Sequence, residues 1–119
     1  MFDIHHDKIG NMAVIECEGS LIGNAAFKLR DAVTSQTGAN IVVIDLSEVY
    51  AIEGCGLGIL IFLQRWARDH DIRLKLFNPS RSVREKLEIA SRLSEFDIVS
   101  LHEMMALLAQ ADRPYEMAA

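Results

Sequence analysis

The chain has 119 residues, of which half are hydrophobic and 24% are charged, and its formal net charge is −5. This length suits one domain. The acidic balance argues against nucleic acid or anionic lipid as the main partner, because both bind clustered lysine and arginine. The first residues lack the pattern of a signal peptide, and the longest strongly apolar run, residues 59–63, is too short to span a bilayer. We therefore expect a cytoplasmic protein without membrane insertion.

The first third of the chain predicts a β-hairpin followed by a helix. Residues 2–4 and 12–17 have β-strand patterns, and the glycine–asparagine pair between them predicts a turn. Apolar residues alternate along the second strand, so Cys17 is expected to face the core. Asn24 is the expected N-cap of a helix that ends before Gly38.

The rest of the chain alternates strands with helices. The predicted strands cover residues 41–44, 74–77 and 96–99, and the predicted helices end near residues 68, 93 and 110. In the middle one of these helices, Ser82 and Glu85 have the spacing of a capping box. This order predicts an α/β fold: a mostly parallel sheet of about five strands with an antiparallel N-terminal edge, packed with about four helices. A single domain is expected over residues 1–111, with a loose tail over residues 112–119.

The four histidines do not have the spacing of a metal site. His5 and His6 are adjacent, so on a strand they point to opposite faces, and His70 and His102 stand alone. The chain contains no pair of cysteines or histidines at the separations typical of zinc ligands. We therefore expect no metal and no cofactor.

Three glycines alternate over residues 54–58, between a buried strand and a helix. A dinucleotide-binding fingerprint would need a further glycine where Ile59 stands, and a phosphate-binding loop would need a lysine that the segment lacks. The glycines are instead expected to permit a tight turn and close packing of the helix.

Cys55, in the middle of this segment, is a candidate reactive thiol. It is expected at a helix N-terminus, where the helix dipole favours a thiolate. Glu53 nearby opposes that negative charge, and no histidine is close in the sequence, although the fold could bring His5 or His6 near. The alternative interpretation is that Cys55 is a small residue that fills a turn. We expect no enzymatic activity.

The segment over residues 41–58 resembles the STAS domain (sulphate transporter and anti-sigma factor antagonist). Residues 45–49, DLSEV, match the family's D-L-S-x-V at the end of a buried strand, and residues 53–57, EGCGL, match its D-S-S-G-L at the start of a helix. Residues 19–21, GSL, are similar to the family's G-x-L. The resemblance covers residues 4–109 and implies the STAS fold.

In the anti-sigma factor antagonists of this family, the serine just before the motif's Gly-Leu is phosphorylated by a partner kinase that is itself the anti-sigma factor. The phosphate abolishes binding between the two proteins. Cys55 matches this serine, Gly54 the preceding hydroxyl residue and Glu53 the aspartate, while Ile22 stands where an acidic residue often follows G-x-L. The resemblance implies a non-enzymatic, protein-binding regulator that lacks the phosphorylatable serine.

The expected partner-binding site combines a helix N-terminus, glycines that let a partner approach the backbone, and an apolar side chain. Its residues are Glu53, Gly54, Cys55, Gly56, Leu57 and Gly58. The resemblance implies an anti-sigma factor kinase-like partner. Two alternatives stay open: a subunit that binds the ATPase of a bacterial lipid-transport ABC system, and a thiol-redox or small-ligand sensor that uses Cys55.

Overall fold

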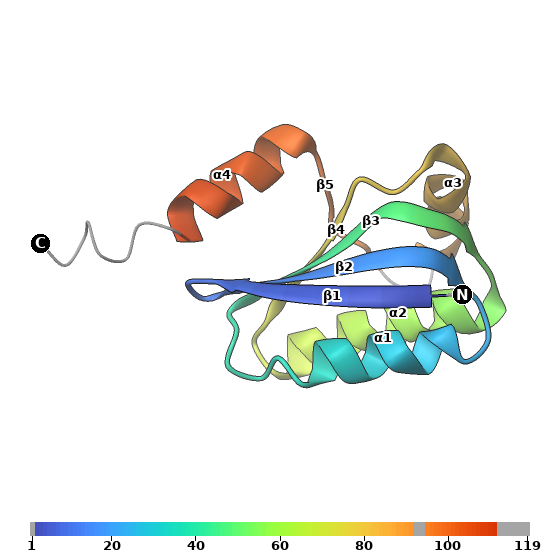
Figure 1. Cartoon of the computed structure of the whole chain (residues 1–119), viewed down its shortest axis with the longest axis horizontal. Coiled ribbons are helices and arrows are strands. Elements are labelled where there is room, and N and C mark those ends of the chain that lie inside the picture. Colours follow the sequence, from blue (N-terminus) through green and yellow to red (C-terminus); the bar gives the residue numbers. More distant parts are fainter. Residues whose placement is uncertain (1, 92–94, 112–119) are drawn as a thin grey trace, which may run out of the picture.

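The computed structural model describes residues 2–91 and 95–111 (Figure 1). The described strands are β1 (Phe2–Ile9), β2 (Met12–Leu21), β3 (Ile41–Ile52), β4 (Arg73–Phe77) and β5 (Ile98–Val99). The described helices are α1 (Ala25–Thr34), α2 (Gly54–Asp69), α3 (Arg81–Ala90) and α4 (Leu101–Ala111). The expected loose tail and residues 92–94, which include the expected end of the third helix, lie outside the described residues.

The strands form one sheet in the order β1-β2-β3-β4-β5. β1 pairs with β2 in antiparallel fashion, and every later pair is parallel, so the predicted α/β fold is confirmed. Figure 1 shows α1 and α2 side by side on one face of the sheet and α4 on the other. The carboxyl ends of the parallel strands therefore lie at the end of the molecule where α1 and α2 begin.

The main core lies between the sheet and helices α1, α2 and α3. Alternation along β2 places Cys17 in this core with 3% of its surface exposed, as the sequence predicts. The helices contribute Leu29, Val33, Leu60, Leu63, Val83 and Leu87, all buried. A smaller cluster on the other face joins Met12, Val14 and Val43 to Met104 of α4. β3 is thus buried on both faces, as its β-branched run predicts.

The central strands are longer than their apolar runs. β2 continues to Leu21 and β3 to Ile52, because the two strands stay paired through two register shifts up to the Leu21–Ile52 pair. The helix expected after the glycine segment 54–58 instead begins within it, at Gly54, so that Cys55 lies at the helix N-terminus as expected. These boundaries are set by backbone pairing and by where the helix starts, and the pattern of apolar residues predicts neither.

The capping box predicted at Ser82 and Glu85 is wrong. α3 begins at Arg81, and its N-cap is Ser80, whose hydroxyl oxygen accepts a hydrogen bond from the Val83 amide at 3.4 Å. Glu85 instead pairs with Arg81 at 3.5 Å. The N-cap of α1 is Asn24 as predicted, although its side chain makes no capping hydrogen bond.

Candidate functional site

The six residues of the predicted site form the junction between β3 and α2. Glu53 follows the strand in an extended conformation, with φ −141° and ψ 174°, and is the N-cap of α2. Its carbonyl oxygen accepts hydrogen bonds from the amides of Gly56 at 2.6 Å and Leu57 at 3.2 Å, which form the first turn of the helix. The first amides of a helix have no intrahelical acceptor and carry partial positive charge. The junction therefore presents a polar, electropositive backbone at the helix start.

The three glycines of the junction have different structural roles. A β-carbon on Gly56 would overlap the carbonyl oxygen of Leu21 and come within 3.0 Å of the Ile52 side chain. At Gly54 and Gly58, by contrast, a β-carbon would meet nothing within 4 Å. The expectation that the glycines serve close helix packing is therefore correct only for Gly56. The packing shown here gives no steric reason for glycine at residue 54 or 58.

Accessibility divides the predicted site into two parts. Glu53, Gly54, Cys55 and Gly58 are exposed, whereas Gly56 is buried and Leu57 is half-buried against the main core. We call the four exposed residues the α2 surface. A partner at this junction would meet these four residues, while Gly56 and Leu57 hold the helix to the sheet.

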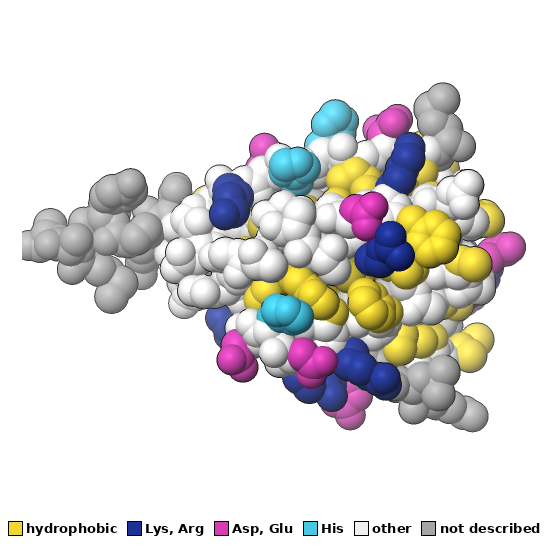
Figure 2. Space-filling model, turned by 90° about the horizontal axis from the view of Figure 1, so that it is seen from below, with side chains coloured by type: hydrophobic (Ala, Val, Ile, Leu, Met, Phe, Trp, Pro, Cys, Tyr) yellow, Lys and Arg dark blue, Asp and Glu magenta, His cyan; other side chains and the backbone are white. Residues whose placement is uncertain are grey.

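Two apolar side chains, which the predicted site did not include, extend the α2 surface. Ile22 follows Leu21, whose carbonyl group contacts the first turn of α2, and 43% of its surface is exposed. Phe62 lies one turn after Gly58 on α2 and is 47% exposed. The four-residue spacing from Gly58 to Phe62 could have identified Phe62 in the sequence. Figure 2 shows exposed apolar side chains, with charged side chains around them, on the face that α1 and α2 form.

Side-chain hydrogen bonds hold β3 ahead of the site, both within the strand and from Asn78 and Lys86. The carboxylate of Asp45 accepts hydrogen bonds from the amide and the hydroxyl of Ser47, and the side-chain amide of Asn78 donates to the Ser47 hydroxyl at 3.1 Å. At the last residue of β3, the Lys86 ammonium donates to the Ile52 carbonyl at 2.9 Å. Asp45 and Ser47 of the DLSEV segment thus have a structural role just before the site.

The two cysteines differ in their surroundings. Burial, with a smaller effect of the negative charge of Asp45, raises the pKa of Cys17 to about 12. Cys55 is exposed as the second residue of α2. His5 lies elsewhere, in a small hollow with Glu16 and Asp45 on the sheet. Within residues 2–91 and 95–111, no hydrogen bond joins a histidine to Cys55, and no group of histidine, cysteine and carboxylate side chains is arranged to hold a metal ion.

Comparison with known proteins identifies the family. A model of the STAS domain matches residues 3–105. The chain belongs to the STAS domain family. No curated protein matches it significantly by sequence. In addition, none of the helices in the described part of this STAS domain is long and apolar enough to span a bilayer.

Solved structures share the fold of this STAS domain. The anti-sigma factor antagonist SpoIIAA in its unphosphorylated form has a TM-score of 0.71 at 16% identity, covering 92% of this chain and 97% of that one. An anti-sigma factor antagonist from Mycobacterium paratuberculosis has a TM-score of 0.78 at 16% identity, covering 92% and 95%. The murine Solute Carrier 26 family member A9 anion transporter has a TM-score of 0.71 at 15% identity, covering 87% of this chain and 18% of that one.

Proposed function

We propose that this STAS domain is a non-enzymatic regulator that binds a protein partner through the α2 surface. The observation that supports the proposal is the open space around Gly58. A glycine inside a helix destabilises it by about 0.8–1.0 kcal/mol relative to alanine. At residue 58 no close packing requires a glycine, because a β-carbon there would meet nothing within 4 Å. A bare helix backbone lets a partner approach closely.

The neighbours of Gly58 suit a protein partner. Cys55, Gly58 and Phe62 lie at helical spacing along α2, so they share a face. Ile22 adds a second exposed apolar side chain from the loop after β2. Apolar side chains at the centre and exposed polar backbone at the edge are the usual composition of a protein interface.

The proposed partner is an anti-sigma factor kinase-like protein. The similarity in fold to two anti-sigma factor antagonists over more than 90% of each chain supports this choice. Cys55 replaces the serine that is phosphorylated in such proteins, so we infer that this domain binds without a serine phospho-switch. The ATPase of a lipid-transport ABC system is the alternative partner, and the variants below test the same surface for both.

The experiment introduces a carboxylate at the centre of the α2 surface. Cys55→Asp places a negative charge in the first turn of α2, where we expect it to stabilise the helix by a few tenths of a kcal/mol. A partner that covers this turn must bury the carboxylate unpaired, which costs roughly 2–5 kcal/mol, or about thirty- to several-thousand-fold in affinity. We expect unchanged thermal stability and lost partner binding, measured by calorimetry with the purified candidate partners.

The matched control is His102→Asp, which places the same charge in the first turn of α4, on the other face of the sheet. This variant should bind like the wild type. Equal affinity of the wild type and a folded Cys55→Asp variant would move the interface away from the α2 surface. Phosphate found on residue 55 by intact-mass measurement, after incubation with a serine kinase of the family, would refute the loss of the switch.

A further inference from the structure

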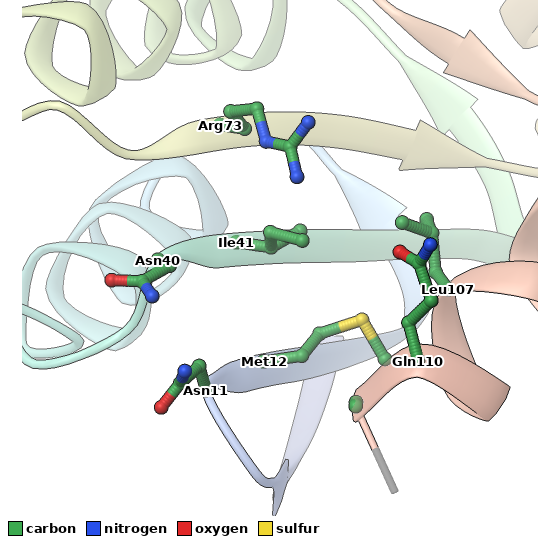
Figure 3. A pocket seen from close by; sticks show the side chains of 8 residues that line it. Asn11, Met12, Asn40, Ile41, Arg73, Leu107 and Gln110 are labelled. Carbon is green, nitrogen blue, oxygen red and sulfur yellow. The ribbon is translucent and has the colours of Figure 1, made fainter. Parts of the chain in front are cut away.

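A hollow of about 280 Å³ lies between α4 and the sheet. Three of its lining residues, Met12, Ile41 and Arg73, are the first residues of β2, β3 and β4. Leu107 and Gln110 line it from α4 (Figure 3). Because these three strands are parallel, the hollow lies at their amino ends, whereas the α2 surface follows the carboxyl end of β3. The hollow is therefore separate from the proposed protein interface.

The walls of the hollow combine an apolar floor with one cation. Met12 is buried, and Ile41 and Leu107 are half-buried in the cluster that joins α4 to the sheet. Arg73 is exposed at the edge, and it takes part in none of the ion pairs found among the described residues. Figure 3 shows its guanidinium group beside the side chain of Ile41. An arginine guanidinium is always charged and matches the geometry of a carboxylate.

At this edge of the sheet, the backbone amides of Asn40 and Arg73 are not free to bind a ligand, so side chains must recognise its polar group. The Arg73 amide donates to the Asn40 carbonyl at 2.9 Å, and the Asn40 amide donates to the Asn11 carbonyl at 2.8 Å. These amides are therefore already paired. A ligand that fits must place an apolar body on the floor and an anionic group at Arg73.

We propose that this hollow binds a small amphipathic carboxylate, of the class of a medium-chain fatty acid. A cavity of about 150 Å³ accommodates benzene, so the present volume suits roughly eight to twelve non-hydrogen atoms. The alkyl chain lies between α4 and the sheet, and the carboxylate pairs with Arg73. Met104 is the one buried residue in the described α4, so a ligand that bridges this helix and the sheet adds contacts where the helix has few.

The test uses octanoate as the probe and octanol as its uncharged counterpart, followed by amide chemical shifts in NMR titrations. Octanoate should shift the amides of Met12, Ile41 and Leu107 and leave that of Cys55 unchanged. Arg73→Gln should weaken octanoate binding by about two- to fivefold, the effect of one exposed ion pair, and leave octanol binding unchanged. Arg84→Gln, which removes an exposed arginine from α3, is the control and should bind octanoate like the wild type.

A second variant tests the cavity itself. Leu107→Trp fills the hollow from α4 and should abolish the octanoate shifts. The proposal is overturned if octanoate gives no shifts at these amides, if Arg73→Gln binds it as tightly as the wild type, or if a folded Leu107→Trp variant still binds. Because Arg73 is exposed, its variant keeps the test valid even where Leu107→Trp fails to fold. Failure here leaves the partner measurements on Cys55→Asp unaffected, because those concern the opposite end of the strands.

Discussion

The carbonyl oxygen of Leu21 occupies the space that a β-carbon on Gly56 would need. Leu21 is the last residue of β2, and Gly56 lies in the first turn of α2, so this contact fixes the start of the helix against the neighbouring strand. Ile22, the next residue along the chain, therefore follows a residue that packs against the start of α2. One buried glycine thus positions the candidate site.

Gly56→Ala should destabilise the protein. The added methyl group would overlap backbone at Leu21, which cannot move away as a flexible side chain could. We expect a loss of about 1–3 kcal/mol in the free energy of unfolding, as for other overpacked sites. Urea denaturation measures it, and unchanged stability would show that the β2–α2 contact is looser than described.

Gly58→Ala should have the opposite effect on stability. A β-carbon at this position meets nothing within 4 Å, so alanine improves helix propensity without a clash. The expected gain is about 0.5–1 kcal/mol in the free energy of unfolding. If Gly58 serves partner binding, the same variant should bind the partner more weakly. A variant that gains stability and keeps full affinity would remove Gly58 from the interface.

The two cysteines should react differently with a thiol reagent. Burial keeps Cys17 inaccessible and raises its pKa to about 12, whereas Cys55 is exposed. Titration with a chromogenic disulfide at neutral pH should therefore modify one thiol in the native protein and two after denaturation. In Cys55→Ser the native protein should show none. Two rapidly reacting thiols in the native wild type would contradict the packing of β2.

The start of α3 can be tested with two serines. Ser80→Ala removes the hydroxyl group that accepts a hydrogen bond from the Val83 amide and should cost about 1 kcal/mol in the free energy of unfolding. Ser82→Ala is the matched control, since Ser82 lies inside the first turn and should change stability little. Thermal or urea denaturation of both variants shows which of the two serines is the N-cap of α3. A larger loss for Ser82→Ala would restore the capping box at Ser82 and Glu85.

Most of the fold could be predicted from the alternation and the helical spacing of apolar residues. Cys17 could be placed in the core because its neighbours alternate along β2, and β3 could be placed in the centre of the sheet because its β-branched run leaves no polar face. The position of Cys55 near a helix start also followed from the sequence. These features depend on residues close in the chain, which a sequence pattern records directly.

Only the tertiary structure separated the three glycines of the α2 start. Gly54, Gly56 and Gly58 look alike in the sequence, and Leu21, more than thirty positions away, decides that Gly56 alone is packed. The hollow at Arg73 could not be predicted from the sequence for the same reason, because its walls come from the first residues of three strands and from α4. Contacts between distant segments depend on how the sheet and helices pack, and no local pattern encodes that packing.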